Sequence, residues 1–267
     1  MVKDMGYPHP PLLRQGAILG VRVVAEPLKQ VLAAVEKVLR SPAREAELLC
    51  PTGVHGVIEA HKDPEFRHIL NKAIFNLADG MPLVIVSRLQ GHRTAGRAFG
   101  PDVMWALLGR SVAPGTSHFF YGGREGVADR LAEISKEAFP GLRVAGTYCP
   151  PFRSLTPDEE EEIVTLINDS GADVVWVGLS TPKQEQWVAA FRERLNVKLL
   201  CSVGAAFDYH TGSIAFAPEW VKMASLEWLF RLFQEPRRLW RRYFEIVPKF
   251  LFLILLQGIG LRRFPEE

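Results

Sequence analysis

The sequence predicts an α/β fold: a Rossmann-like, mainly parallel sheet with helices on both faces, followed by a basic helical appendage at the C-terminus. The first observation is that short apolar strands alternate with helical patterns of roughly 10–15 residues, which implies right-handed βαβ crossovers. The second is the length of 267 residues, which exceeds the roughly 100–150 residues of a common single domain. We therefore divide the chain into an α/β domain at residues 1–217 and an appendage at residues 218–267.

The first half of the chain opens as a strand followed by a helix. Continuous apolar runs indicate buried strands, and apolar residues at helical spacing indicate helices. The elements expected here are a strand at 17–24, a helix at 27–40, a brief apolar stretch at 47–50, a helix at 63–77, the turn dipeptide Asp79-Gly80 and a strand at 83–86.

The alternation is clearer in the second half. Acidic residues crowd the first turns of the helix that begins at Pro157, as the helix dipole favours. Because ligands of such sheets bind at the carboxyl ends of the strands, we expect the functional site at that edge. The elements expected here are strands at 118–121, 142–147, 173–177 and 198–203, and helices at 125–138, 157–168 and 182–195.

Composition and charge exclude several classes of protein. Thirty-two basic residues against 30 acidic ones give a net charge of +2, so no field of the whole molecule would drive nucleic-acid binding. Cys50, Cys149 and Cys201 form neither a CxxC pair nor an even disulfide set, which fits a reducing cytosolic compartment. We expect no secretory signal, and no apolar stretch reaches the ~18–20 residues of a transmembrane helix.

The composition changes near Pro218. Between residues 222 and 263, nine Lys and Arg stand against three acidic residues, and aromatic and leucine side chains supply most of the rest. Such a segment is typical of an element that lies in a membrane interface beside anionic lipid. We therefore favour a membrane-associating appendage, with a helix pair docked on the core as the alternative. Its densest basic cluster is Arg237, Arg238, Arg241 and Arg242.

Glycines at strand ends offer a cradle for phosphate. Glycine lets backbone amides approach an anion, and the N-terminus of the following helix favours negative charge. Tyr121 is a candidate substrate-binding residue, and Gly122 and Gly123, which follow it, are the candidate pyrophosphate site. Gly178, a further binding candidate, and Gly204 end two other strands. The alternative is that these glycines serve packing only. The pattern is neither GxGxxG nor the P-loop motif, which argues against a nicotinamide enzyme and a P-loop ATPase.

Asp79 is the candidate general base. It lies in the turn before Gly80 and Pro82, from which its carboxylate would project into a cleft. The alternative is an ordinary Asp-Gly turn. Thr52 and His55 follow the short apolar stretch and are candidates for binding a sugar hydroxyl or another ligand group, with plain loop chemistry as the alternative.

Further polar residues are candidates for substrate contacts. Gln184 and Glu185 fall in the first turn of a helix, where they face the cleft or only cap that helix. Asp208 would bind ribose or uracil, with Phe207 beside it as an aromatic face, or else pair with a local cation.

Arg93 and Arg97 lie in a polar loop and would neutralise diphosphate charge, unless both are simply solvated. No clustered pattern of His, Cys or carboxylate residues supports a metal site. We therefore expect a metal-independent reaction and no cofactor.

Six motifs stand in a fixed order along the chain: Ala78-Asp79-Gly80-Met81-Pro82, Arg93-(x)2-Gly96, Phe120-Tyr121-Gly122-Gly123, Gly146-Thr147-Tyr148-Cys149-Pro150-Pro151-Phe152, Gly178-(x)3-Pro182-Lys183-Gln184-Glu185-(x)-Trp187 and Gly204-(x)2-Phe207-Asp208-(x)3-Gly212. In this combination they closely resemble the WecG/TagA/CpsF family of bacterial glycosyltransferases, glycosyltransferase family 26. The resemblance runs from about Gly20 to Phe250.

The resemblance implies inverting, metal-independent transfer of a sugar, such as N-acetylmannosamine or its uronic acid, from a UDP-sugar. The implied acceptor is a polyprenyl-diphosphate-linked sugar at the cytoplasmic face of the bacterial membrane, and the product is teichoic acid, exopolysaccharide or a related surface polysaccharide. By this resemblance the catalytic aspartate matches Asp79, the acceptor-side threonine Thr52, the Gln of the PKQE motif Gln184 and the loop arginine Arg93. The family often has Asn where this chain has Val54, which leaves the donor sugar open.

In this interpretation Asp79 removes a proton from the acceptor hydroxyl, and one displacement inverts the anomeric centre. The amides of Gly122 and Gly123, with Arg93 or arginines of the appendage, would take the charge that develops on UDP. The alternative function is a non-catalytic nucleotide-binding scaffold of a polysaccharide assembly complex. The sequence leaves the final glycan and the formation of a homo-oligomer open.

Overall fold

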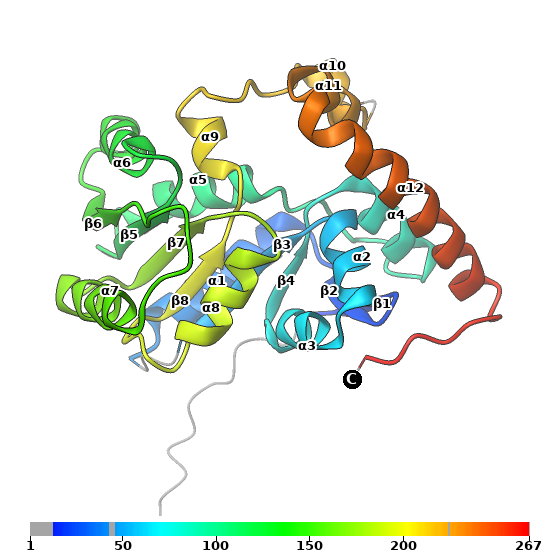
Figure 1. Cartoon of the computed structure of the whole chain (residues 1–267), viewed down its shortest axis with the longest axis horizontal. Helices are drawn as coiled ribbons and strands as arrows, with labels where there is room; N and C mark the ends of the chain where they lie inside the picture. Colours follow the sequence, from blue (N-terminus) through cyan, green and yellow to red (C-terminus); the bar gives the residue numbers. More distant parts are fainter. Residues whose placement is uncertain (1–12, 43–45, 224, 267) are drawn as a thin grey trace, which may run out of the picture.

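The computed structural model describes residues 13–42, 46–223 and 225–266, and it confirms the α/β class (Figure 1). Its centre is an eight-stranded sheet in the order β1-β2-β4-β3-β8-β7-β5-β6, in which all neighbours are parallel except β1 and β2. The strands are β1 (Gln15–Ile18), β2 (Val21–Val24), β3 (Glu47–Thr52), β4 (Phe75–Ala78), β5 (Ser117–Gly122), β6 (Arg143–Tyr148), β7 (Val174–Gly178) and β8 (Leu199–Ser202).

Helices cover both faces of this sheet (Figure 1). One face packs against α2 (Val54–Lys62), α3 (Pro64–Lys72), α7 (Pro157–Ser170), α8 (Lys183–Phe191) and α12 (Pro236–Gly258). The other face packs against α1 (Leu28–Arg40), α5 (Gly100–Ser111), α6 (Val127–Ala138) and α9 (Ala206–His210). The remaining helices are α4 (Met81–Leu89), which contacts β1 and β4, and α10 (Glu219–Met223) and α11 (Glu227–Gln234).

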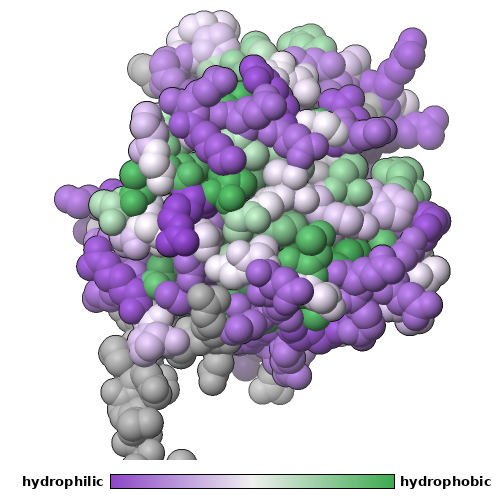
Figure 2. Space-filling view, turned by 90° about the vertical axis from the view of Figure 1, so that its left-hand side faces the viewer, coloured by the Kyte–Doolittle hydropathy of each residue, from purple (hydrophilic) through white to green (hydrophobic). Residues whose placement is uncertain are grey.

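The two apolar layers explain why the strands are so hydrophobic. Every residue of β4, β5 and β8 is buried, as expected for parallel strands covered on both sides. The edge strand β6 is instead half-buried along most of its length. Figure 2 shows the face at this edge, where hydrophilic residues cover most of the surface and apolar residues are exposed between them.

The elements expected beyond residue 117 are confirmed, with shifts of a few residues at their ends. The helix expected at 27–40 is also confirmed as α1. In this part of the chain each apolar run is bounded by glycine, proline or a cluster of polar residues. The spacing of apolar residues and the residues that bound each run therefore indicate the same elements, and the strand and helix assignments follow from the residues alone.

The single strand expected at 17–24 is wrong, because the run folds back on itself as β1 and β2. The turn is made by Leu19 and Gly20, whose φ angles are 51° and 83°. Leu19 is fully buried, and its main-chain N–H donates to the Oε1 of Gln257 in α12 (3.0 Å). A contact from the far end of the chain therefore supports a left-handed leucine, which the local sequence does not indicate.

The helix expected at 63–77 is wrong in its second half. Helix α3 ends at Lys72, and β4 begins at Phe75. The apolar run that ends at Ala78 therefore forms a central strand between β2 and β3. Short apolar runs fit a buried helix or a buried strand equally well, and here pairing within the sheet decides.

The strand expected at 83–86 is also wrong, because these residues lie in α4, with Pro82 in its first turn. Helix α2, which begins directly after Gly53, was not expected from the sequence pattern. Both helices start where a parallel strand ends, and both therefore place their N-termini at the carboxyl edge of the sheet. Asp79 accordingly follows a strand rather than a helix.

The appendage is helical, as expected, and comprises α10, α11 and α12. Helix α12 continues through Pro248, and Lys62 of α2 lies 3.6 Å from Glu245 on α12. The Nε2 of Gln257 also donates to the carbonyl oxygen of Ala17 (2.8 Å). In the part of the chain that the structure describes, no helix combines the length and apolar character needed to cross a membrane. The division at residue 217 stays a prediction.

Candidate active site

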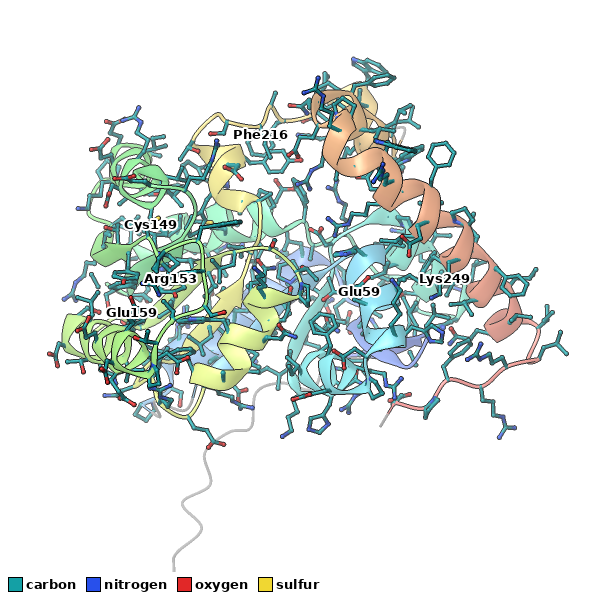
Figure 3. The ribbon with its side chains drawn as sticks, in the orientation of Figure 1. Glu59, Cys149, Arg153, Glu159, Phe216 and Lys249 are labelled. Carbon is teal, nitrogen blue, oxygen red and sulfur yellow. The ribbon has the colours of Figure 1, made fainter. Side chains whose placement is uncertain are left out.

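A cleft of about 520 Å³ opens at the carboxyl ends of the parallel strands. Residues that follow β3, β4, β5, β7 and β8 form one side of it, and the appendage forms the other. Phe216 lies between α9 and the appendage, and its ring also lines the cleft (Figure 3). The strand-end residues in the lining include Gly53, Asp79, Gly123, Gly178 and Gly204, and the polar residues from the appendage are Lys222, Ser225, Glu227, Arg231, Arg242 and Tyr243.

Asp79 is held by main-chain contacts on both sides. Its N–H donates to the carbonyl oxygen of Thr52 (3.0 Å), which joins the ends of β3 and β4. Its Oδ1 accepts a hydrogen bond from the N–H of Gly100 at the start of α5 (2.8 Å). Its Oδ2 faces Gly53, because a Cβ on that glycine would lie 3.8 Å from this oxygen. One carboxylate oxygen is thus fixed by the protein, and the other lies beside Gly53, which also lines the cleft.

The pKa of the Asp79 carboxyl group is raised above its ordinary value, chiefly because burial disfavours the charged form. The hydrogen bond from Gly100 and the positive charges of Arg97 and Arg231 oppose this rise, whereas the negative charge of Glu227 adds to it. A general base is most effective when its pKa approaches the operating pH. The surroundings of Asp79 therefore suit the removal of a proton from a hydroxyl group.

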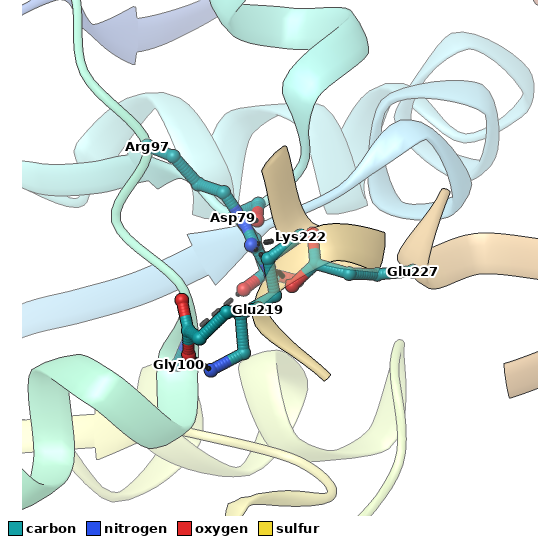
Figure 4. Close-up of polar contacts among 6 residues, drawn as sticks. All are labelled: Asp79, Arg97, Gly100, Glu219, Lys222 and Glu227. Atoms are coloured by element: carbon teal, nitrogen blue, oxygen red, sulfur yellow. Dashed lines mark hydrogen bonds and ion pairs between the residues drawn. The ribbon is translucent and has the colours of Figure 1, made fainter. Parts of the chain in front are cut away.

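The loop between α4 and α5 brings Arg97 to Asp79 (Figure 4). The Nε of Arg97 donates to the main-chain carbonyl oxygen of Asp79 (3.0 Å), and its Nη1 lies 2.5 and 2.6 Å from the two carboxylate oxygens of Glu227. Arg93 is exposed and does not line the cleft. In this geometry Arg97, rather than Arg93, has the position expected of the loop arginine.

Gln184 and Glu185 form a buried polar pair in the first turn of α8. The Nε2 of Gln184 donates to the Oε1 of Glu185 (2.9 Å) and to the carbonyl oxygen of Ser202 (3.3 Å). The hydroxyl of Thr181 donates to the same Glu185 oxygen (3.0 Å). Among the described residues, the Oε1 of Gln184 has no hydrogen-bond partner. Gln184 contributes to the cleft lining, and this buried oxygen is therefore an unused hydrogen-bond acceptor in the cleft wall.

The glycine pair at the end of β5 is closely packed. The N–H of Gly123 donates to the carbonyl oxygen of Gly178 (2.8 Å), so this amide is not free for a phosphate group. Gly122 has a φ of 114°, and a Cβ there would lie 2.7 Å from the same carbonyl oxygen. A Cβ on Gly178 would likewise lie 2.7 Å from the ring of Phe207. These contacts agree with the packing alternative, and the Gly123 amide is already bonded within the protein in this arrangement. A phosphate contact by this pair stays a prediction.

The two aromatic candidates are core residues. Tyr121 is 1% exposed and stacks on Trp187 with ring centres 4.3 Å apart, and it does not line the cleft. Phe207 reaches the cleft lining, yet it is also 1% exposed and packs edge to face on Phe120. Neither ring presents an open face on which a base could stack.

Of the two candidates Thr52 and His55, only His55 lines the cleft. The side chain of Thr52 is buried, and its hydroxyl donates to the carbonyl oxygen of Cys50 (3.2 Å) rather than lining the cleft. His55 lines the cleft, and its Nδ1 is buried without a partner among the described residues. Asp208 lies at the cleft and 3.4 Å from the guanidinium of Arg124, which agrees with the pairing alternative.

The appendage contributes three cations to the cleft, Lys222, Arg231 and Arg242. Burial lowers the pKa of Arg242, as expected for a charge taken partly out of water. Of the predicted basic cluster, Arg237 and Arg241 are exposed, and the side chain of Arg238 lies outside the described ones. Lys222 and Arg231 were not among the residues expected at the site, although the positive charge of the appendage indicated this segment.

A comparison with protein families identifies the chain. The family model described as "Glycosyl transferase WecG/TagA/CpsF family" matches residues 17–264. The chain belongs to the WecG/TagA/CpsF family of glycosyltransferases. This confirms the resemblance on which the sequence interpretation was based.

Two curated relatives of this family member come from Bacillus spizizenii and Bacillus subtilis, and both are named N-acetylglucosaminyldiphosphoundecaprenol N-acetyl-beta-D-mannosaminyltransferase. The first is 32% identical over 197 residues, which is 74% of this chain and 74% of the relative. The second is 29% identical over 211 residues, which is 78% of this chain and 80% of the relative. The protein is therefore a glycosyltransferase of the hexosyltransferase class.

The matched region includes both sides of the cleft, from the strand ends to α12. In this WecG/TagA/CpsF member the cleft contains a carboxylate with a raised pKa and several cations, and its wall includes a glutamine whose buried oxygen has no partner among the described residues. A positioned carboxylate can act as a general base, and fixed positive charges can stabilise a leaving phosphate.

Proposed function

We propose that the protein transfers N-acetylmannosamine, its uronic acid or a related N-acetylhexosamine from a UDP-sugar to a polyprenyl-diphosphate-linked sugar during synthesis of a bacterial surface polysaccharide. Membership of the family and the names of the two Bacillus relatives support this donor and acceptor chemistry. The observation that carries the proposal is the position of Asp79, whose Oδ2 faces Gly53 in the cleft while Oδ1 is held by Gly100.

The reaction follows from this position as a single displacement. The acceptor hydroxyl oxygen bonds to the anomeric carbon of the donor sugar, and its proton passes to Oδ2 of Asp79. The bond between the anomeric carbon and the diphosphate oxygen breaks, and UDP leaves with the bonding electrons. Because attack and departure take place on opposite faces of the sugar, the anomeric configuration inverts.

The cations of the cleft would take up the charge that develops on UDP without a metal ion. Arg97 comes from the core, while Lys222, Arg231 and Arg242 come from the appendage. Such preorganised charges act strongly where water is excluded, because they need no reorganisation as the leaving group forms. The appendage would thereby supply part of the active site in addition to any role in localisation.

We also propose that the protein lies on the inner face of the cytoplasmic membrane and that the appendage is the contact. One side of α12 carries large apolar residues that are exposed to solvent, namely Trp240, Phe244, Val247, Leu251 and Leu255. Basic residues flank them, among them Arg241, whose guanidinium carbon lies 5.4 Å from the centre of the Trp240 ring. Apolar and aromatic side chains with neighbouring positive charge suit a helix in the lipid interface.

The test is the release of UDP from a panel of UDP-sugars with a GlcNAc-diphosphate-lipid acceptor. We expect turnover with at least one N-acetylhexosamine donor, and Asp79→Asn should reduce it by ~10²-fold or more while UDP still binds. Near-full activity of Asp79→Asn would remove this residue from the role of base. UDP binding without release from any donor would instead favour the non-catalytic scaffold.

A further inference from the structure

Glu227 connects the appendage to the loop between α4 and α5, which carries Arg97. It lies in the first turn of α11, where the helix dipole favours a carboxylate, and both of its oxygens contact the Nη1 of Arg97 at 2.5 and 2.6 Å. The side chains are 19% and 20% exposed, respectively, so the pair is largely removed from water. Figure 4 shows the two side chains meeting beside Asp79.

The remaining contacts of Arg97 fix the plane of its guanidinium. The Nε donates to the carbonyl oxygen of Asp79 (3.0 Å), and the guanidinium carbon lies 4.3 Å from the centre of the Phe99 ring. Among the described residues, no hydrogen bond is made by the Nη2 of Arg97. The guanidinium therefore uses Nε and Nη1 within the protein and keeps the two N–H groups of Nη2 for a ligand in the cleft that it lines.

We propose that Glu227 is a positioning residue for the transfer reaction: it holds Arg97 so that Nη2 can bind the diphosphate of the donor. This inference rests on the proposed function, which supplies the diphosphate. Bidentate binding of an oxyanion by arginine requires a fixed guanidinium plane. Two hydrogen-bond partners fix the plane of Arg97: the carbonyl oxygen of Asp79 in the core and the carboxylate of Glu227 in the appendage. Docking of the appendage thus adds the ion pair with Glu227 to the two contacts that Arg97 makes with the core, the Nε hydrogen bond and the Phe99 ring.

An inhibitory role for Glu227 would have the opposite effect on the affinity for UDP. If the Glu227 carboxylate occupied the place of a substrate phosphate, its removal would strengthen the binding of UDP. The free Nη2 favours positioning, since an arginine blocked by an inhibitory carboxylate would have few donors left for the substrate. Measured affinity for UDP separates the two roles directly.

The experiment is a double-mutant cycle on UDP affinity, measured by isothermal titration calorimetry. Glu227→Leu should weaken UDP binding by about tenfold or more, as expected when a charged hydrogen-bonding partner is lost. In an Arg97→Leu background the same change should alter the affinity by less than about twofold, because Glu227 acts only through Arg97. Glu227→Gln, which keeps an acceptor for Nη1, should give an intermediate loss.

Glu245→Gln is the matched control. Glu245 is also an appendage glutamate, but it is 70% exposed and pairs with Lys62 outside the cleft lining. This variant should bind UDP as the wild type does and unfold at the same temperature. Tighter binding of UDP by Glu227→Leu would overturn the proposal, as would equal losses in the two Arg97 backgrounds, which would indicate a general loss of appendage structure.

The pH profile adds a readout that a purely structural role would not move. Glu227 raises the pKa of Asp79, so Glu227→Gln should shift the acid limb of kcat/KM to lower pH. The other charged groups that act on this carboxyl, Arg97 and Arg231, are retained. The titratable groups that line the same cleft are also retained, namely His55, Asp208, Tyr209, Lys222, Arg242 and Tyr243. If the acid limb of kcat/KM in Glu227→Gln stayed at the wild-type pH, an effect of Glu227 on Asp79 would be contradicted.

The calorimetric cycle does not depend on turnover. A wild-type protein that binds UDP and shows the expected cycle, yet releases no UDP from any UDP-sugar, would overturn the proposed function while supporting the role of Glu227 in anion binding. A protein that turns over UDP-sugars normally without Glu227 would overturn this inference and leave the proposed function intact.

Discussion

Gly53 and Asp79 face each other in the cleft, at the ends of the neighbouring strands β3 and β4. A Cβ on Gly53 would lie 3.8 Å from the outer carboxylate oxygen of Asp79, which is ordinary van der Waals contact. The φ of Gly53 is −100°, so its backbone conformation is open to any residue. The missing side chain therefore keeps the space in front of the proposed base open, rather than relieving backbone strain.

This relationship predicts a graded loss of activity at position 53. Gly53→Ala should fold normally and lower kcat/KM only modestly, whereas Gly53→Val should lower it by roughly 10²-fold, because a displacement of about 1 Å at a reacting centre can have that effect. Steady-state kinetics with an unchanged melting temperature would establish the point. A fully active Gly53→Val enzyme would show that the acceptor does not approach Asp79 from this side.

The raised pKa of Asp79 predicts the pH dependence of the reaction. The carboxyl group must be ionised to accept a proton, and its folded-state pKa lies above the ordinary value of 3.8. Activity should therefore fall as the pH drops through this raised pKa, at a higher pH than an unperturbed aspartate would give. The measurement is kcat/KM against pH in the wild type. An acid limb at or below pH 4 would contradict a base buried in this way.

Arg97 and Arg93 form a matched pair for mutation within one loop. Arg97→Gln should reduce kcat/KM by about tenfold or more, since it removes a charged hydrogen-bonding group from the cleft. Arg93→Gln should stay within about twofold of the wild type, because surface substitutions away from a site have small effects. The reverse result would return the role of the loop arginine to Arg93.

Glu185 should act through the orientation of the Gln184 amide. Glu185→Leu removes the acceptor for both Gln184 and Thr181 and should lower kcat/KM by about tenfold or more. Glu185→Gln can keep an acceptor oxygen in the same place and should retain most activity. Kinetics and thermal melts of both variants test this. Equal losses would mean that the acid itself, and not the orientation of Gln184, matters.

The exposed apolar side of α12 should be required for binding to lipid. Phe244 and Leu251 are 75% and 61% exposed, and their replacement by serine should weaken binding to anionic vesicles by tenfold or more, at about 1.5–3 kcal/mol for each large side chain. Phe152→Ser is the control, because Phe152 is an exposed large apolar residue that lies after β6 rather than on α12. Vesicle sedimentation would measure this. Equal binding by all variants would exclude α12 as the contact.

Much of the fold followed from local pattern, and the errors share one cause. The helices and strands beyond residue 117 were predictable because each has a clear period and clear boundaries. The strand β4 was assigned to a helix because its apolar run fits both states, and only its pairing with β2 and β3 decides between them. The turn at Leu19 depends on Gln257, which is remote in sequence.

For the site, the sequence indicated several residues that line the cleft but could not orient their side chains. It singled out Asp79 and Gln184, and both line the cleft. Thr52 is the last residue of β3, at the same edge of the sheet, yet its hydroxyl donates to the carbonyl oxygen of Cys50 inside the protein. Side-chain direction at the end of a strand depends on the neighbouring helix packing, which periodicity does not contain.

The sequence by itself determined the α/β class, the family and the basic character of the appendage, because these depend on composition, period and motif order. Only the tertiary structure decided which charges meet. Asp79 follows a strand, Arg97 lies in a loop, and Glu227 and Arg231 lie in one helix, up to about 150 residues away in the chain. These residues act on one another only because the appendage folds back over the carboxyl edge of the sheet. Electrostatic interaction depends on distance in space and on burial, and neither is written in local sequence.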